Sequence, residues 1–360
     1  MKKILFYLNS MKPAGGIERV VSTIVGKLSS SYEITILVKD DGDSFYAISD
    51  NVKLVSMNNP LILNMNNRLF RIFQIGKSVF TSVKFLRSFI HNNRYDYIYI
   101  THPMNHVEYL LAGGNTDKLI ISEHGSSHGY NFFYRIIKRL TYKSCLFYCI
   151  PTKQDYNLYM SKGFPAVYIP HFRSDMVFSL NNKKEKIVLN VGRFTADKQQ
   201  LVLLYCWNQL VIRGLLPDGW TLIIIGEGEL ENELLKFIKD NQLNSVTLLR
   251  TLTRIESIYS KVSIFALTSR FEGFGMVLLE AISFGVPCVS FDCPSGPRDI
   301  IEDGYNGFLA ELNNVEEYID KLSILLKESD LREEMGRNAL IKAEEWNDNI
   351  ILQHWFKVFK

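Results

Sequence analysis

The 360-residue sequence has no apolar run of the roughly 18 residues that a membrane-spanning helix requires. It has only five cysteines, an odd number scattered through apolar segments, and no Cys or His pairs complete a zinc site. These absences predict buried, reduced thiols and a cytoplasmic protein whose membrane contact is peripheral. The length suffices for two domains of ordinary size.

Acidic residues are absent from two long intervals of the first half, 51–95 and 124–154. Residues 1–175 carry 21 Lys and Arg against 12 Asp and Glu, a net charge of +9. The remaining residues carry 20 basic against 26 acidic side chains, a net charge of −6. A basic half of this kind is a candidate for contact with anionic lipid, nucleic acid or a phosphorylated acceptor.

Within the first acid-free interval, apolar residues recur at steps of three and four from Leu69 to Ile90, which predicts an amphipathic helix. Basic and aromatic side chains accompany it, and the second interval repeats this mixture. Such helices can lie at a membrane surface, so an anionic membrane is an expected partner of segments 66–93 and 130–143. The alternative is a pair of core-facing helices with basic outer sides.

Short apolar runs typical of buried strands alternate with helical patterns along the chain. This alternation predicts an α/β fold with parallel sheets and helices on both faces. A polar linker at 181–186 separates two such series, so we expect a domain boundary near residue 178. The expected strands are 3–9, 33–39, 52–57, 95–101, 118–122, 146–151, 187–191, 220–225, 246–249, 262–267 and 287–291.

The stretch 269–281 concentrates the features of a ligand-binding loop. It follows the expected strand 262–267 and contains Glu272, a Gly-Phe-Gly segment and a helical pattern from about Met276. Glycine lets the backbone approach a ligand closely, and the unpaired N–H groups at a helix start favour phosphate. Because Glu280 lies about one turn into the helix, the two carboxylates can meet different parts of an elongated ligand.

The spacing of Glu272 and Glu280 resembles the E-x7-E motif of retaining two-domain glycosyltransferases, the family 4 group with the GT-B fold. The resemblance implies two Rossmann-like parallel-sheet domains that face each other across a cleft. It places an acceptor-binding domain at 1–178 and a nucleotide-sugar-binding domain at 179–342. A last helix, at 343–360, is expected to return to the first domain.

The resemblance also implies roles for single residues. In the family, the first Glu of the motif lies against the donor sugar and the second binds the ribose, which corresponds here to Glu272 and Glu280. A Gly-Arg…Lys pair, here Arg193 and Lys198, holds the donor diphosphate, which suits a guanidinium fork and an ammonium point charge. A His after a strand, here His124, lines the reacting face, so Glu272 and His124 are the expected catalytic residues. Further implied donor-binding residues are Gly15, Gly16, Gly226, Arg250, Thr251, Gly273, Phe274, Gly275, Met276 and Val277.

Two positions depart from the family pattern. Gln199 stands where the family usually has Gly, and the loop after 246–249 lacks the family's glycine, which leaves the nucleobase open. Asp41 and Asp43 spell the D-x-D of metal-dependent glycosyltransferases, but they lie in a polar turn after a strand and are interpreted as turn residues. We therefore expect no metal and no cofactor apart from the nucleotide-sugar co-substrate.

The sequence thus predicts a retaining glycosyltransferase that moves a hexose or N-acetylhexosamine from a nucleotide sugar, expected to be a UDP-sugar. The expected acceptor is a saccharide or lipid-linked saccharide in cell-surface polysaccharide assembly, at the inner face of the cytoplasmic membrane. One alternative is a nucleotide-sugar epimerase or hydrolase of the same architecture. Another is a non-catalytic nucleotide-sugar-binding subunit, which would be expected to have lost a motif residue. Binding of nucleic acid would explain the basic first half of the chain but not the glycine-containing loops suited to phosphate, so nucleic acid is not an expected partner.

Overall fold

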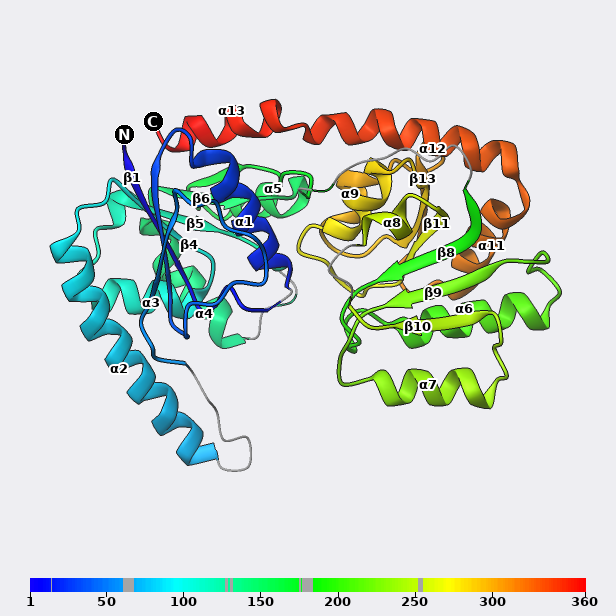
Figure 1. The fold of residues 1–360 in the computed structure, drawn as a ribbon, viewed down its shortest axis with the longest axis horizontal. Coiled ribbons are helices and arrows are strands. Elements are labelled where there is room, and N and C mark those ends of the chain that lie inside the picture. The colour runs from blue at the N-terminus through cyan, green and yellow to red at the C-terminus, as the bar shows by residue number, and fades with distance from the viewer. Residues whose placement is uncertain are drawn as a thin grey trace. The chain divides into compact units, whose positions relative to one another are not determined.

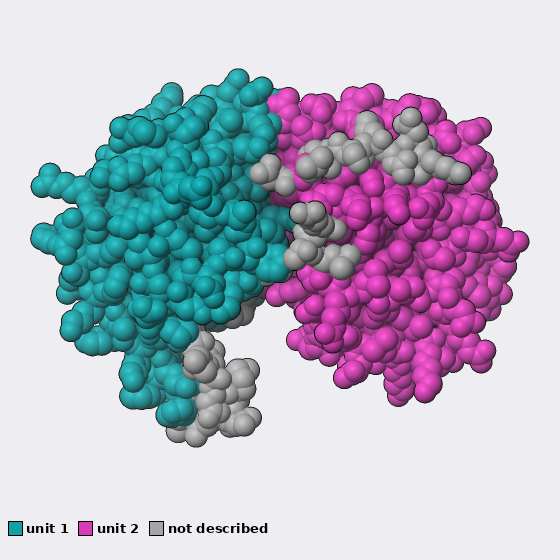
Figure 2. Space-filling model, in the orientation of Figure 1, with its two compact units in different colours: residues 1–125, 130–172, 348–360 teal, residues 126–129, 173–347 magenta. Residues whose placement is uncertain are grey.

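The computed structural model describes residues 1–13, 15–60, 68–126, 129, 132–174, 176, 184–251 and 255–360. These residues form two compact units (Figure 2). Unit 1 comprises residues 1–125, 130–172 and 348–360, and unit 2 comprises residues 126–129 and 173–347. The expected boundary at 178/179 lies outside the described residues, and the one at 342/343 lies within helix α12 (Ser329–Ala343).

Unit 1 contains a seven-stranded sheet in the order β3-β2-β1-β4-β5-β6-β7, and every neighbouring pair is parallel (Figure 1). The central strands are continuous buried apolar runs, as expected of a parallel sheet with helices on both faces. The strands are β1 (Lys3–Leu8), β2 (Glu33–Val38), β3 (Lys53–Ser56), β4 (Tyr97–Ile100), β5 (Leu119–Ser122), β6 (Phe147–Ile150) and β7 (Ala166–Tyr168). The helices are α1 (Gly16–Leu28), α2 (Arg68–Asn92), α3 (Pro103–Leu111), α4 (Phe132–Thr141) and α5 (Lys153–Ser161).

Unit 2 contains a six-stranded parallel sheet in the order β10-β9-β8-β11-β12-β13. Its core is built around Trp207, Leu222 and Ile264, all fully buried. The strands are β8 (Glu185–Val191), β9 (Thr221–Ile225), β10 (Val246–Leu249), β11 (Val262–Leu267), β12 (Cys288–Phe291) and β13 (Gly307–Ala310). The helices are α6 (Gln200–Ile212), α7 (Glu231–Asp240), α8 (Glu256–Tyr259), α9 (Met276–Ser283), α10 (Pro297–Ile300), α11 (Val315–Lys327) and α12 (Ser329–Ala343).

The last helix, α13 (Asp348–Val358), belongs to unit 1. Trp355 on this helix is buried, and its ring centroid lies 5.9 Å from that of Tyr99. An ion pair of 2.7 Å joins Lys27 Nζ to Asp348 Oδ2 at the start of the helix. The expected return of the chain to its first domain is therefore made by α13, which begins at Asp348 rather than at residue 343.

The two parallel α/β sheets confirm the predicted fold class, and every strand expected from an apolar run is present. The resemblance also implied a strand at 168–172, which is wrong beyond Tyr168, because β7 ends there. The strand β13 was not expected, and β7 and β13 both lie at a sheet edge. Among the described residues, no helix combines the length and the apolar character that crossing a membrane would demand.

Each sheet reverses its strand order once next to its first strand. In unit 1, β1 lies between β2 and β4, and in unit 2, β8 lies between β9 and β11. At such a point the loops that follow adjacent strands diverge and leave a crevice at the carboxyl ends of the strands, where α/β proteins bind ligands. The loops after β8 and β11 carry Arg193, Lys198 and Glu272.

Candidate functional site

In unit 2, hydrogen bonds join the loop after β8 to the loop after β11. Thr268 Oγ1 donates to the carbonyl oxygens of Lys198, at 3.3 Å, and Gln199, at 3.0 Å. The backbone N–H of Arg270 donates to the carbonyl oxygen of Asp197 at 2.8 Å. These bonds hold the two loops side by side at the reversal point of the sheet.

Lys198 and Glu272 form an ion pair between these loops. Lys198 Nζ lies 2.6 Å from Glu272 Oε1 and 2.7 Å from Oε2, and Ser269 Oγ donates to Oε1 at 2.6 Å. The Glu272 side chain is 7% exposed and that of Lys198 is 24% exposed. The cation assigned to the diphosphate and the carboxylate assigned to the sugar are thus direct partners in this structure.

The backbone at Gln199 has a φ of +52°, in the left-handed region, directly before α6 begins. Glycine adopts this conformation without steric cost, whereas a residue with a Cβ is strained there. The glycine that the resembled family usually has at this position therefore has a conformational reason. Gln199 keeps the same turn, so the departure from the family pattern does not displace Lys198 from the loop.

Arg193 also follows β8, and its side chain is exposed. Its guanidinium has no hydrogen-bond or ion-pair partner within the described ranges. The next residue fixes the loop, because the N–H of Phe194 donates to the carbonyl oxygen of Glu227 at 2.9 Å. A Cβ at Gly226 would lie 2.0 Å from the carbonyl oxygen of Gly192, so glycine is required where the loops after β8 and β9 touch.

The amino end of α9 presents unpaired backbone donors beside this loop. Gly275 precedes the helix with a φ of +91°, and its carbonyl oxygen accepts the N–H groups of Leu278 and Leu279. The N–H groups of Met276 and Val277 make no hydrogen bond in the part of the chain that the structure describes. Unpaired donors and the positive end of the helix dipole favour an anion at this position.

Glu280 lies on α9 and is only 1% exposed. Its two carboxylate oxygens accept hydrogen bonds from Ser174 Oγ, at 2.6 Å, and from the Tyr259 hydroxyl, at 3.0 Å. These donors stabilise a buried carboxylate. Sequence reasoning did not single out Ser174 or Tyr259, because each is remote from Glu280 in sequence and belongs to no motif.

The other predicted donor-binding residues of unit 2 differ in their solvent exposure. Phe274 is buried and its ring centroid lies 6.3 Å from that of Trp346, whereas Gly273 is partly exposed. Arg250 and Thr251 follow the edge strand β10 and are exposed. They lie at the same sheet edge as Arg193, but two strands away from β8.

Gly15, Gly16 and His124 belong to unit 1, at the carboxyl edge of its sheet. Gly15 is the N-cap of α1, which follows β1. His124 follows β5, and its ring stacks on that of His171 with centroids 5.3 Å apart and an interplanar angle of 11°. Burial lowers the pKa of His124 to about 4 despite the neighbouring Glu123 carboxylate, so the imidazole is neutral at neutral pH.

His102 is a further polar group at this edge that sequence reasoning missed. It follows β4, next to the reversal point, and its Nδ1 accepts the N–H of Met104 at the start of α3. Burial, with a contribution from Lys39, lowers the pKa of His102 to about 4. The signal was available, because a Thr-His-Pro segment comes directly after the expected strand 95–101, as Glu-His-Gly does after 118–122.

Glu123 holds the His124 loop through a buried ion pair. Its Oε1 accepts the backbone N–H groups of His124 and Gly125 at 3.2 Å each, and its Oε2 accepts from Lys138 and Tyr148. Lys138 is 3% exposed. Its ammonium therefore faces inward and cannot contribute to the basic outer surface expected for segment 130–143.

Asp41 and Asp43 are held by a lysine in the structure. Lys12 Nζ lies 2.8 Å from Asp41 Oδ2 and 3.3 Å from Asp43 Oδ2, and all three side chains are exposed. Among the described residues, no group of three or more His, Cys, Asp or Glu side chains is arranged to hold a metal ion.

Comparisons with known proteins cover both units. The family whose sequence model matches residues 172–341 is described as "Glycosyl transferases group 1". The chain is 28% identical over 374 residues to the amylovoran biosynthesis glycosyltransferase AmsD of Erwinia amylovora, covering 99% of both proteins. It is 25% identical over 364 residues to a GalNAc-alpha-(1->4)-GalNAc-alpha-(1->3)-diNAcBac-PP-undecaprenol alpha-1,4-N-acetyl-D-galactosaminyltransferase of Campylobacter jejuni, covering 99% of this chain and 98% of that protein. The crystal structure of Anabaena Alr3699/HepE in complex with UDP and glucose matches with a TM-score of 0.77 at 18% identity, covering 100% of this chain and 99% of that one.

Proposed function

Because residues 172–341 match the model of the group 1 glycosyltransferases and the chain has the GT-B fold, we propose that it belongs to this family and transfers a sugar from a nucleotide sugar with retention of configuration. The family and the fold are those that the sequence predicted. The observation that carries the proposal is the grouping in unit 2 of Arg193, the Lys198–Glu272 pair and the amino end of α9 at the reversal point of one sheet. This grouping offers positive charge to a diphosphate and a carboxylate to the attached sugar.

The proposed donor is a UDP-sugar that carries a hexose or an N-acetylhexosamine. Support for UDP comes from the Anabaena structural neighbour, which was solved with UDP and glucose. Support for a lipid-linked acceptor comes from the Campylobacter relative, whose name contains a PP-undecaprenol saccharide. The Erwinia relative belongs to amylovoran biosynthesis, which supports a role in bacterial polysaccharide assembly.

In the proposed reaction, the bond between the anomeric carbon and the diphosphate breaks, and an acceptor hydroxyl oxygen bonds to the same carbon from the leaving-group side. Negative charge grows on the departing phosphate oxygen, which takes up the proton of that hydroxyl. Arg193 and the N–H groups of Met276 and Val277 stabilise that charge, and such preorganised donors act most strongly where charge develops. Lys198 supplies a second cation and holds the Glu272 carboxylate, which orients the hydroxyl groups of the sugar. Glu280 holds the ribose.

A panel of UDP-, GDP-, ADP- and dTDP-hexoses and N-acetylhexosamines tests the proposal, with and without a pyrophosphate-linked lipid saccharide as acceptor. We expect mass spectrometry to show one added sugar on the acceptor, with a UDP-sugar, and NMR to show an α-linkage from an α-donor. Epimerised or hydrolysed donor that forms equally without the acceptor would support the epimerase or hydrolase instead. Binding of the nucleotide sugar without any turnover would support the non-catalytic subunit.

Activity should persist in excess EDTA, because we propose that no metal or other cofactor is needed. Arg193, Lys198 and the helix end supply the positive charge, and Asp41 and Asp43 are engaged by Lys12. Initial rates measured with and without EDTA provide the check. Complete loss of activity that returns on adding manganese or magnesium would contradict this expectation.

We also propose that the protein works at the inner face of the cytoplasmic membrane, because α4 exposes apolar side chains. Phe132, Ile136 and Leu140, four residues apart on one helix face, are 73%, 40% and 75% exposed. Arg135 and Arg139 are exposed beside them, whereas Lys138 is buried. A helix with an exposed apolar face and adjacent basic residues is suited to the interface of an anionic bilayer.

The protein should float with vesicles that contain anionic lipid, and recovery should fall as salt rises, because each basic residue contributes roughly 1 kcal/mol that salt screens. Neutral vesicles should recover much less protein. The double variant Phe132→Ser/Leu140→Ser should recover poorly, whereas Ile212→Ser/Ile341→Ser, which removes two exposed isoleucines of unit 2, should match the unmodified protein. Equal recovery with both lipid types would favour the alternative, in which α4 is a structural helix without a role at the membrane.

A further inference from the structure

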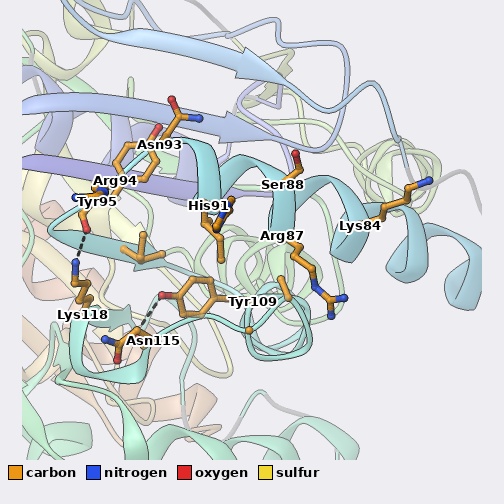
Figure 3. Close-up of a pocket in the computed structure, with 14 residues that line it drawn as sticks. Lys84, Arg87, Ser88, His91, Asn93, Arg94, Tyr95, Tyr109, Asn115 and Lys118 are labelled. Atoms are coloured by element: carbon orange, nitrogen blue, oxygen red, sulfur yellow. Dashed lines mark hydrogen bonds between the residues drawn. The ribbon is translucent and has the colours of Figure 1, made fainter.

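Unit 1 contains a pocket at the edge of its sheet opposite to the His124 loop. It has a volume of about 710 Å³ and lies between α2, α3 and the segments that lead into β4 and β5 (Figure 3). Tyr95 and Lys118, which line it, precede these two strands, so the pocket is at the amino ends of the strands. The residues proposed for glycosyl transfer lie on loops at the carboxyl ends of the strands, so this pocket has no part in the proposed reaction.

The rim of the pocket is basic. Lys84, Arg87, His91, Arg94 and Lys118 line it, and no Asp or Glu does so among the described residues. Figure 3 shows α2, with Lys84, Arg87 and His91, along one side, and Tyr109, Asn115 and Lys118 on the other. The floor is largely apolar, formed by Ile90, Tyr95, Ile98, Tyr109 and Ala112.

Two of the basic side chains shape the pocket. Arg87 Nη2 donates to the carbonyl oxygen of Leu111, at the end of α3, and Lys118 Nζ donates to that of Tyr95, both at 2.9 Å. Cations at carbonyl groups of helix ends are ordinary structural contacts. Lys84, His91 and Arg94 are exposed and have no such partner within the described ranges, so a structural contact does not account for them.

The exposed face of α2 leads from aromatic side chains into this rim. Phe70, Phe73, Lys77, Phe80, Lys84, Arg87 and His91 follow steps of three and four residues, which places them along one line of the helix. Phe73 is 65% exposed and Phe80 is 72% exposed. Phenylalanine side chains are more stable in an apolar phase than in water, so this line of residues is suited to contact with an amphiphile.

We propose that the pocket binds the phosphate head group of an anionic membrane phospholipid, with Phe73 and Phe80 inserted into the adjacent interface. The phosphate meets the basic rim, and the glycerol and first chain carbons meet the apolar floor. The continuous line of phenylalanines favours a lipid over a free phosphate. The proposal rests on the membrane association proposed above and adds a specific lipid site to it.

Calorimetric titration with dihexanoyl phosphatidylglycerol, below the concentration at which it forms micelles, tests the pocket without any membrane. The double variant Lys84→Gln/Arg94→Gln should bind about twenty-five-fold more weakly, because each cation near a phosphate contributes about fivefold. The control Lys236→Gln/Lys239→Gln removes the same charge from α7 in unit 2 and should bind as the unmodified protein does. Phe73→Ser/Phe80→Ser should lower vesicle flotation while leaving this titration unchanged.

Absence of binding by the unmodified protein, or equal affinity of Lys84→Gln/Arg94→Gln, would overturn the head-group site. Inorganic pyrophosphate that binds as tightly as the lipid would overturn the lipid as its occupant. If the protein floats with anionic vesicles but does not bind the short-chain lipid, the membrane association is supported and the proposal of a head-group site in the pocket is rejected. Binding of the short-chain lipid without flotation would support the pocket and reject the membrane association.

Discussion

Replacing Arg193 with alanine should lower turnover about a hundredfold to a thousandfold while the protein stays folded. The side chain is exposed and has no partner in the described part of the chain, so its loss removes no native contact. It removes a donor to the departing diphosphate, and loss of one preorganised donor at a developing anion costs about 3 kcal/mol.

Initial rates at saturating donor, with circular dichroism as a check of folding, measure this effect. Arg337→Ala, at an exposed arginine of α12 in the same unit, is the matched control and should keep full activity. A near-normal rate in Arg193→Ala would contradict the proposal that the donor diphosphate binds beside Arg193.

Lys198→Ala should reduce both turnover and stability, because it leaves the Glu272 carboxylate, 7% exposed, without its cation. Breaking a fully buried pair costs about 3–5 kcal/mol, and the partial exposure of Lys198 makes the loss here smaller. The double variant Lys198→Ala/Glu272→Gln removes the unpaired charge and should recover the melting temperature but not the activity. Recovery of activity would mean that Lys198 acts only by supporting the fold.

The second large effect concerns the carboxylates of Glu272 and Glu280. Changing each to glutamine should alter the kinetic constants in a different way. Glu272→Gln should lower kcat most, since we propose that this residue, beside the glycine loop, orients the sugar as charge develops in it. Glu280→Gln should raise KM for the donor more than it lowers kcat, because contacts to the ribose are equal in the ground and transition states. The Ser174 and Tyr259 hydroxyl groups can rotate to accept from the new amide, so the Glu280 variant should fold.

Calorimetric titration with UDP separates the two roles, because UDP carries no transferred sugar. Glu272→Gln should bind UDP as the unmodified protein does, and Glu280→Gln should bind it more weakly. Loss of UDP binding in the Glu272 variant, with retention in the Glu280 variant, would reverse the two assignments.

The sequence by itself determined the sheet strands of both units that are buried on both faces. Strands such as β1 and β11 are continuous apolar runs, because parallel sheets are covered by helices on both sides. The short edge strands were only partly expected: the apolar runs of β3 and β10 indicated them, whereas β7 and β13, which are 3 and 4 residues long, did not stand out. A short edge strand needs no apolar run of its own, and its pairing partner decides whether it forms.

The sequence also indicated which loops carry the residues of the proposed site, because glycines, cations and paired carboxylates have a recognisable spacing. Only the tertiary structure decided which of them touch. Lys198 and Glu272 are 74 residues apart, and Ser174 and Glu280 are 106 apart, so no local pattern records either contact. These residues meet only because the elements that carry them pack side by side, and this packing is a property of the tertiary structure.

The orientation of α4 was likewise decided only by tertiary structure. Its sequence predicts an amphipathic helix, and a lysine on such a helix ordinarily faces water. Lys138 is instead buried, because Glu123 on the β5 loop supplies a carboxylate that compensates the charge, while Phe132 and Leu140 are left exposed. The period of a helix shows that it has two faces, but the partner that a neighbouring element provides determines which face is buried.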